Sequence, residues 1–398
     1  MHKNLLFLPG PVSVSDAVLA AASRPLIDHR GPEFAEVLSR VTARLQAIFG
    51  TTSHVALLGS SGTGGLEAAF VSLLSPGDRV LSCPVGVFGK RFAEIARCHG
   101  AQVEVLDTPT GEALDPLRLR ARLQQDAGGE IAAILLTQNE TSTGVQNDMT
   151  ALARAIGDHA ALTLVDAVSG MGGSEFRMDE WRFDAVVSAS QKVFATPPGL
   201  AMVALSSRAV ARTQSAGARH YYFDLAKSIE FARIGQTPWT PPVSLFFALD
   251  AALAQYQHEG GPAIWRRLRT YARAIRAAVE ALELELFSQP GAHSDTVVAV
   301  RVPEGIDAAA MLKRLREERG IVLSGGQAEL KGKIFRIGTM GELSQIDVLG
   351  MLGALEIALL EQGRSVKIGA GVQAALRVFL ERDEDKLAKP TERAVAPA

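Results

Sequence analysis

The sequence predicts an α/β protein in which a mostly parallel sheet is covered by helices on both faces. From about residue 33 onward, apolar strand-like runs alternate with amphipathic helical segments. The apolar runs are nearly continuous, which is typical of parallel strands buried on both sides. Around residue 255 the pattern changes, and a smaller α+β domain is expected beyond it.

The expected strands of the sheet are short apolar runs at 54–58, 79–85, 101–107, 131–137, 161–168, 183–190 and 200–205. Apolar residues spaced three and four apart indicate helices between them, at 33–50, 66–77, 88–100, 116–125 and 149–159. In the later part of the chain we expect helices at 260–284, 308–320 and 344–363 and strands at 296–302 and 333–338.

A chain of 398 residues is too long for one small core, so more than one domain is expected. We expect an N-terminal arm over 1–20, a large domain over 21–254 and a small domain over 255–385. The remaining segment, 386–398, is charged and rich in Pro and Ala, which is typical of a flexible tail.

Composition excludes several classes of protein. The net charge is −2 and no basic block occurs, so neither a nucleic-acid partner nor a membrane surface is expected. Cys83 and Cys98 are the only cysteines, which excludes a disulfide scaffold and fits a reduced compartment. Only four consecutive apolar residues precede Pro9, too few for a signal peptide. We therefore expect a cytoplasmic protein, and we expect no metal site.

A glycine-rich turn, "GSSGTGG" over 59–65, lies between a strand and a helix. Glycines let backbone N–H groups approach an anion, and a helix N-terminus favours negative charge. Ser61 and Thr63 add hydroxyl donors. The spacing fits neither the Walker A motif nor G-x-G-x-x-G. The turn therefore predicts a phosphate site, with a merely tight turn as the structural alternative.

Two charged residues follow apolar strands. Asp166 ends "LTLVD", and Lys192 comes directly after "FDAVVSASQ". In open α/β sheets the carboxyl ends of the strands are where ligands bind. Taken singly, Asp166 could be a helix cap and Lys192 a solvated loop residue. Small residues before Lys192 and Pro197-Pro198-Gly199 after it favour an enclosed pocket, where lysine acts as a nucleophile or base.

The three features together are what pyridoxal 5'-phosphate requires. The glycine-rich turn would anchor the phosphate, Asp166 would keep the pyridinium nitrogen protonated, and Lys192 would bind the aldehyde as a Schiff base. A buried lysine at a strand end is then explained, because it need not stay charged.

The sequence resembles the class V aminotransferases of the pyridoxal-phosphate fold type I superfamily, closest to the alanine/serine–glyoxylate aminotransferases. The resemblance extends from "FLPGPVSV" to "IGAGVQAAL" and is carried by ordered matches. They are "DHRGPEF", "GSSGTGGLEAA", "LSPGDRVL", "NETSTGV", "LVDAVSGMGG", "FRMDEW", "SQK", "PPGLA", "TPPVSL" and "KIFRIGTMG". It implies a large domain with a mostly parallel seven-stranded sheet and a smaller α+β C-terminal domain.

The resemblance also implies roles for individual residues. Lys192 would be the Schiff-base lysine and the acid/base at Cα, and Asp166 would pair with the ring nitrogen. The other residues implied in cofactor binding are Ser61, Gly62, Thr63 and Gln191 at the phosphate, Phe88 on the ring face, Thr141 at the ring hydroxyl, and Thr240 from a partner subunit. A homodimer with shared sites follows from the role of Thr240.

Substrate recognition is implied for four residues. Arg336 would hold the α-carboxylate through a bidentate fork, and Gly10 would leave room for it. His29 and Arg30 would form a polar wall near the substrate side chain, or would serve only in packing or at an interface.

The implied reaction moves the amino group of serine, alanine or aspartate to glyoxylate or pyruvate by a ping-pong mechanism. An aminoethylphosphonate or a ureidoglycine transaminase would share the cofactor site, so both stay open. A cysteine desulfurase needs a cysteine after the lysine, and none follows Cys98. A non-catalytic cofactor-binding module of a regulator usually carries an added DNA-binding segment, and no basic segment of that kind flanks this domain. The spacing of the glycines disfavours a nicotinamide dehydrogenase.

Overall fold

The computed structural model describes residues 4–387. Its central sheet has seven strands in the order β2 (His54–Gly59), β10 (Leu200–Leu205), β9 (Ala185–Ala189), β8 (Leu162–Asp166), β5 (Ile131–Thr137), β3 (Arg79–Ser82) and β4 (Gln102–Val105). Only β10 runs antiparallel to its neighbours, β2 and β9, while the other pairs are parallel. The predicted α/β class and mostly parallel seven-stranded sheet are confirmed.

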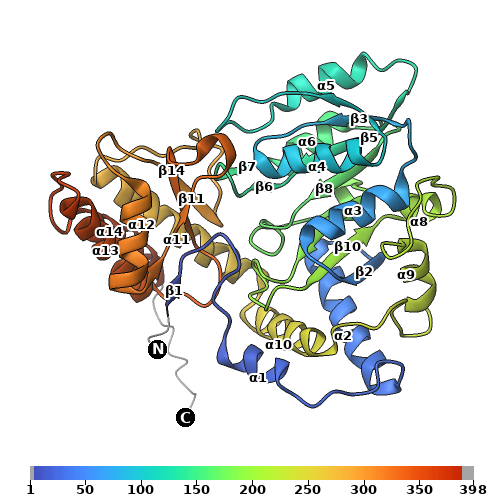
Figure 1. Cartoon of the computed structure of the whole chain (residues 1–398), viewed down its shortest axis with the longest axis horizontal. Helices are drawn as coiled ribbons and strands as arrows, with labels where there is room; N and C mark the ends of the chain where they lie inside the picture. The colour runs from blue at the N-terminus through green and yellow to red at the C-terminus, as the bar shows by residue number, and fades with distance from the viewer. Residues whose placement is uncertain (1–3, 388–398) are drawn as a thin grey trace, which may run out of the picture.

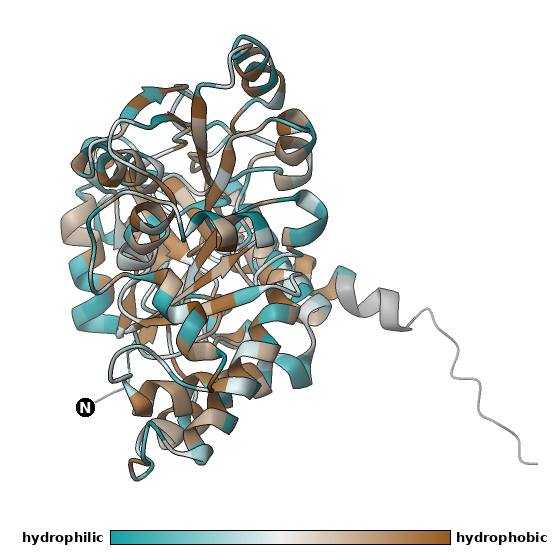
Figure 2. Ribbon diagram, turned by 90° about the vertical axis from the view of Figure 1, so that its right-hand side faces the viewer, coloured by the Kyte–Doolittle hydropathy of each residue, from teal (hydrophilic) through white to brown (hydrophobic). Residues whose placement is uncertain are grey.

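In the strands other than the edge strand β4, side chains enter two separate cores, one on each face of the sheet. In β10, Met202 packs in one core with Phe246 of α10 (Val243–Glu259), and Val203 packs in the other with Phe70 of α3 (Gly62–Leu73). Because both faces are covered, the strands read as continuous apolar runs rather than as alternating ones. Figure 2 shows these hydrophobic strands in the interior, with hydrophilic stretches on the outer helices.

The helices divide between the two faces. One face carries α10 together with α2 (Pro32–Phe49), α5 (Pro116–Gln124), α6 (Met149–Ile156) and α7 (Met178–Trp181). The other carries α3 together with α4 (Val87–Cys98), α8 (Ser207–Arg212) and α9 (Leu225–Ala232). α1 (Asp16–Ala22) packs on α10 through Val18 and Ala248. Figure 1 shows this layered part to the right.

A second, smaller sheet lies to the left in Figure 1. Its antiparallel strands follow the order β11 (Val297–Arg301), β14 (Ile334–Gly338) and β13 (Ser324–Gly325). The helices of this part are α11 (Gly261–Ala281), α12 (Ala308–Arg319), α13 (Gln345–Glu361) and α14 (Ala370–Leu387). β1 (Leu5–Leu6) pairs with β12 (Ile321–Val322), and Phe7 packs in the hydrophobic core that this sheet and these helices form. The start of the described chain is therefore built into this part of the molecule.

The expected domain limits fall differently among the elements. Residue 255 lies within α10, and the chain turns at Gly260, where φ is +85° between α10 and α11. Of the expected tail, residues 386 and 387 belong to α14, and residues 388–398 lie outside the described part. The division into domains stays a prediction.

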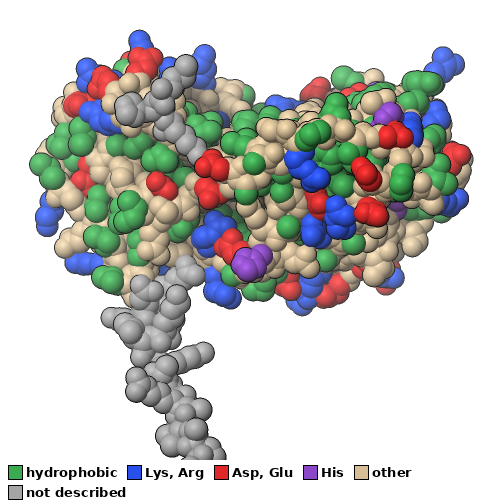
Figure 3. Space-filling model, turned by 90° about the horizontal axis from the view of Figure 1, so that it is seen from below, with side chains coloured by type: hydrophobic (Ala, Val, Ile, Leu, Met, Phe, Trp, Pro, Cys, Tyr) green, Lys and Arg blue, Asp and Glu red, His purple; other side chains and the backbone are tan. Residues whose placement is uncertain are grey.

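The surface is mixed in charge. Figure 3 shows Lys and Arg side chains interspersed with Asp and Glu side chains over the face seen from below. Over residues 4–387, no helix has both the length and the apolar character needed to cross a membrane.

Candidate active site

The carboxyl ends of the parallel strands bring the predicted site residues to one edge of the large sheet. Asp166 is the last residue of β8, Ser61 follows β2, and Lys192 follows β9. Phe88 lies at the start of α4 after β3, and Thr141 follows β6 (Asn139–Glu140), just beyond β5. Parallel pairing brings the ends of β9, β8, β5 and β3 to this edge. β2 ends there as well, because the antiparallel strand β10 lies between it and β9.

Lys192 is buried in the loop between β9 and β10, whose two ends are joined by hydrogen bonds. Ser190 Oγ donates to Pro197 O and accepts from Leu200 N, at 2.8 and 3.3 Å. Lys192 is 8% exposed, and its Nζ donates to Pro9 O at 2.5 Å. Burial lowers the pKa of Lys192 to about 8, aided by the charges of Arg336 and Arg91 and opposed by Asp166. A neutral amine is therefore accessible near neutral pH.

Gly10 lies directly against this lysine. Its φ is +114°, and a Cβ there would lie 2.6 Å from Lys192 Nζ. Any other residue would be strained in its backbone and would displace the amine. The structure thus brings the predicted residue Gly10 from the N-terminal segment to Lys192 in the middle of the chain.

Asp166 is the buried carboxylate of the site. It is 4% exposed, and its Oδ1 accepts from Val168 N at 3.0 Å. Burial, together with the charge of Glu140, raises the pKa of Asp166 to about 7, while Val168 N, Lys192 and Arg91 oppose the shift. A cationic group placed beside this carboxyl would favour its ionised form.

The glycine-rich turn forms the N-terminus of α3. Ser61 is the N-cap, and its Oγ accepts from Gly64 N at 3.4 Å. A Cβ at Gly62 would lie 2.7 Å from Val168 Cγ2, so this glycine lets the turn approach the loop after β8. Thr63 Oγ1 accepts from Arg91 Nη1 at 3.3 Å. The turn therefore combines a helix N-terminus, hydroxyls and a nearby cation, which suits an anion.

Phe88 stands beside this turn. The guanidinium carbon of Arg91 lies 4.7 Å from the centroid of the Phe88 ring, one helical turn along α4. The ring and the guanidinium thus form one stacked unit.

Arg336 comes from β14 of the smaller sheet and is 4% exposed. Its guanidinium donates to Gly325 O at 2.7 and 3.0 Å, to Thr141 O at 3.1 Å and to Gln327 Oε1 at 3.4 Å. All of these acceptors are neutral. Burial lowers the pKa of Arg336 to about 10, opposed by the charge of Glu140. Such a buried cation is suited to a carboxylate ligand.

Three predicted residues form no hydrogen bond with this group in the described part of the chain. Arg30 donates from Nη1 to Thr237 O at 2.6 Å and to Gln236 Oε1 at 2.9 Å, so it holds the segment before Thr240. His29 is partly buried in the loop before α2. Thr240 is exposed, and among the described residues it has no hydrogen bond to the glycine-rich turn.

Comparison with known proteins identifies the family. The model of the family "Aminotransferase class-V" matches residues 16–338. The chain belongs to the class V aminotransferases. It is an aminotransferase that uses pyridoxal phosphate.

Similar proteins match this class V aminotransferase over nearly its whole length. It is 38% identical to an L-aspartate–glyoxylate aminotransferase of Paracoccus denitrificans, covering 94% of this chain and 95% of the other. It is 39% identical to a protein of Anabaena cylindrica named soluble hydrogenase 42 kDa subunit, covering 95% and 99%. The crystal structure of pyridoxamine–pyruvate aminotransferase from Mesorhizobium loti superposes with a TM-score of 0.91 at 32% identity, covering 96% and 98%.

The residues at the sheet edge fit the cofactor of the family. Among the described residues, Gln191 Oε1, in the residue directly before Lys192, is buried without a hydrogen-bond partner. The turn lies against the loop after Asp166 through Gly62 and Val168, and the charges of Asp166 and Lys192 act on each other, so an anion-binding turn, a buried carboxyl, a buried amine and the partnerless amide oxygen of Gln191 lie at one edge of the sheet. This arrangement suits a molecule that carries a phosphate, a basic ring nitrogen and an aldehyde.

Glu140 and Arg91 also belong to this group, although they were not among the residues predicted from the sequence. Glu140 is fully buried, and its charge acts on both Asp166 and Arg336. Arg91 contacts both Thr63 and Phe88. Both residues lie inside or beside motifs that predicted their neighbours, "NETSTG" and "VGVFGKR", so proximity in sequence was the signal that could have found them.

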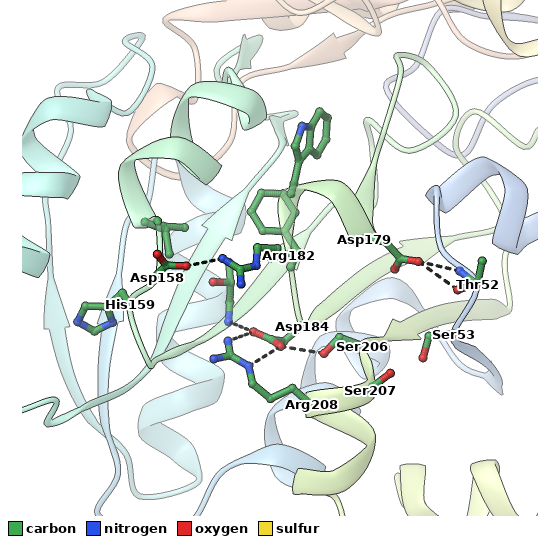
Figure 4. Close-up of a pocket in the computed structure, with 15 residues that line it drawn as sticks. Thr52, Ser53, Asp158, His159, Asp179, Arg182, Asp184, Ser206, Ser207 and Arg208 are labelled. Atoms are coloured by element: carbon green, nitrogen blue, oxygen red, sulfur yellow. Dashed lines mark hydrogen bonds and ion pairs between the residues drawn. The ribbon is translucent and has the colours of Figure 1, made fainter.

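A different cavity, of about 400 Å³, opens at the opposite edge of the sheet, before β8 and β9 (Figure 4). Its carboxylates are already paired within the wall. Asp184 accepts from Arg208 Nη2 at 2.5 Å and from Ser206 Oγ at 2.8 Å, and Asp158 accepts from Arg182 Nη1 at 2.5 Å. These pairs leave the amine, carboxyl and guanidinium of the other edge as the better candidate for amino-group chemistry.

Proposed function

We propose that this class V aminotransferase moves the amino group of a small L-amino acid to glyoxylate or pyruvate by a ping-pong mechanism. Serine, alanine and aspartate are the proposed donors. The observation that carries the proposal is the placing of Arg336, a buried cation with neutral partners, at the same site as the buried amine of Lys192 and the carboxyl of Asp166. The similarity to an aspartate–glyoxylate enzyme supports the choice of acceptor.

When bound, pyridoxal phosphate holds the amino group between donor and acceptor and takes up the electron pair released at Cα. Ser61, Gly62, Thr63 and Gln191 would hold its phosphate, Phe88 would cover its ring, Thr141 would bind the ring hydroxyl, and Asp166 would keep the ring nitrogen protonated. Arg336 would bind the α-carboxylate and so fix the orientation of the Cα–H bond. Lys192 Nζ would remove the Cα proton and would return it to the cofactor carbon on the other side of the amino nitrogen, two bonds from Cα.

The pKa of Lys192 suits this task. A base works best when its pKa lies near the working pH, and burial lowers the pKa of Lys192 to about 8. Gly10 keeps the space around Nζ open, and Pro9 O orients the amine. The chemistry therefore relies on a lysine that burial has made available in its neutral form.

We also propose a homodimer in which Thr240 reaches the phosphate of the partner's site. The exposure of Thr240 and its lack of a bond to the turn of its own chain support this. His29 and Arg30, in the loop before α2, would face the substrate side chain only in such an assembly. A cytoplasmic location belongs to the proposal and rests on the two free cysteines, Cys83 and Cys98.

The visible absorption spectrum of the purified protein tests the proposal. With pyridoxal phosphate supplied, the band of the bound cofactor is expected to bleach on addition of serine, alanine or aspartate and to return with glyoxylate. A band that only a phosphonate or another amine bleaches would keep the family and overturn the donor. The result of this spectroscopic titration does not depend on how the relatives are named, including the relative named as a hydrogenase subunit.

The variant Lys192→Ala is expected to lose transamination and the visible band of the lysine-bound cofactor. The variant Lys313→Ala is the control, because Lys313 is exposed on α12 and pairs only with Glu317 at 4.0 Å. Normal turnover by Lys192→Ala would overturn the role of this lysine.

A further inference from the structure

Glu140 is a fully buried carboxylate that accepts hydrogen bonds from two directions. Its Oε1 accepts from the backbone N and the Oγ of Ser142, at 3.0 and 2.6 Å. Its Oε2 accepts from Phe88 N and Gly89 N, at 3.0 and 3.1 Å. Burial raises the pKa of Glu140, yet every one of these partners can donate, so the surroundings are built for the ionised form.

This carboxylate caps a helix to which it does not belong. The first N–H groups of an α-helix have no partner within the helix, and Gly86, the N-cap of α4, has no side chain to supply one. Ser142 Oγ accepts from Val87 N at 3.0 Å, and Glu140 takes the next two amides. A Cβ at Gly86 would lie 2.5 Å from Ser142 Oγ, so the close approach requires glycine there.

The cap joins residues that the proposed function places around the cofactor and substrate. Phe88 is held through its own amide, since Glu140 Oε2 binds it at the start of α4. Thr141 lies between Glu140 and Ser142, and its carbonyl accepts from Arg336 Nη1 at 3.1 Å. Glu140 therefore connects the helix that carries the ring-stacking residue to the loop that supports the guanidinium.

We propose that Glu140 is a positioning residue that clamps α4 to the loop after β5 and thereby sets the places of the Phe88 ring, of Thr141 and of the Arg336 guanidinium. The proposal rests on the proposed roles of these three residues. Without the clamp, the ring face and the carboxylate site would both lose their fixed geometry, which costs binding of cofactor and substrate.

The chain contains a matched control in Glu356 of α13. Glu356 is also buried, and it accepts from Gly369 N, Gly371 N and Val372 N at 2.6, 2.9 and 3.2 Å, at the start of α14. It is thus another carboxylate that caps a helix from a different element, but it lies between α13 and α14, and within residues 4–387 it has no hydrogen bond to the site residues named above.

The experiment compares Glu140→Gln with Glu356→Gln in the full-length holoenzyme. Glutamine has nearly the same size as glutamate, but its NH2 group would face backbone N–H groups that are themselves donors. The melting temperature of both variants is therefore expected to fall by several degrees. Only Glu140→Gln is expected to raise the dissociation constant of pyridoxal phosphate and the KM of the amino donor, each by about tenfold or more. Its induced circular dichroism in the cofactor's visible band is also expected to fall.

Equal cofactor affinity, KM and dichroism in the two variants would overturn the proposal and leave a purely structural cap. If Glu140→Gln does not fold, Ser142→Ala removes one partner and keeps the carboxylate, and the same pattern with smaller changes is expected. The spectrum of the wild-type enzyme separates the two hypotheses. A wild-type protein without the visible band overturns the proposed function, whereas a normal wild type beside an unaffected Glu140→Gln overturns only the clamp.

Discussion

Burial makes single residues of this site chemically unusual. Lys192 and Asp166 are opposite charges at the end of neighbouring parallel strands, and burial moves their pKa values toward each other, to about 8 and about 7. Near neutral pH each group can therefore exchange a proton at small cost. In the proposed mechanism the amine of Lys192 uses this property as a base, and the protonated ring nitrogen of the cofactor would favour the ionised form of the Asp166 carboxyl.

Arg336→Ala is expected to raise the KM for every α-amino acid donor by roughly 10- to 100-fold, because a charge-assisted bidentate contact is lost. The turnover number should fall less. Arg301→Ala is the control, since Arg301 lies on the adjacent strand β11 but is exposed and pairs with Glu285 at 3.6 Å. Steady-state kinetics with serine, alanine and aspartate measure this. Unchanged KM values would place the carboxylate site elsewhere.

Asp166→Asn is expected to stabilise the cofactor-free protein, and to do so more as the pH rises. The folded carboxyl has a raised pKa of about 7, so folding is most favourable while it is protonated and loses stability as the pH rises toward 7. Asparagine removes this loss, which amounts to at most about 4 kcal/mol. Urea unfolding of both apo proteins at pH 4 to 8 measures the difference. A gain independent of pH would contradict a buried, titrating Asp166.

At the scale of the elements, strand β14 of the smaller sheet holds the N-terminal segment that reaches Lys192. Gly338 at the end of β14 donates from its N–H to Phe7 O at 2.7 Å, and the arm then passes close over it. Two residues further, Pro9 O accepts from Lys192 Nζ. The smaller sheet therefore holds the N-terminal segment at Phe7, and the same segment contacts Lys192 through Pro9 O.

Gly338→Ala is expected to destabilise the protein by about 1–3 kcal/mol and to weaken cofactor binding. A Cβ there would lie 2.5 Å from Leu8 C and 2.9 Å from Pro9 N, so the arm must move. Gly350→Ala is the matched control, because Gly350 lies within α13 and a Cβ would meet nothing within 4 Å. That variant should gain about 0.5–1 kcal/mol from helix propensity. Thermal unfolding of both variants, each with and without cofactor, tests the pair, and equal effects would contradict it.

At the scale of the whole molecule, the proposed composite site can be tested by mixing subunits. Lys192→Ala and Thr240→Glu are each expected to be inactive as homodimers. If Thr240 serves the partner's site, a mixed dimer has one site with both defects and one with neither, so randomly reassociated subunits regain about a quarter of the activity. If Thr240 serves its own site, both sites of the mixed dimer stay defective, and absence of recovery would refute the shared site. Sedimentation should give twice the chain mass of 42.3 kDa.

The sequence by itself determined the class of fold and most of the candidate site. Continuous apolar runs between amphipathic helices specify a sheet buried on both faces, and strand-end motifs identify Lys192, Asp166 and the turn at Ser61. These features are local, because hydrophobic periodicity and turn chemistry are encoded in neighbouring residues. Parallel strands then bring their ends together without further information.

Only the tertiary structure decided the contacts between distant segments. The antiparallel pairing of β10 with β2, the placing of Gly10 and Pro9 O against Lys192, the support of Arg336 by Thr141 O, and the capping of α4 by Glu140 all join residues that are far apart in sequence. Periodicity cannot reveal such contacts, since a buried carboxylate has no pattern of its own. Burial and donor geometry, which exist only once the chain has folded, make it a cap instead of an exposed charge.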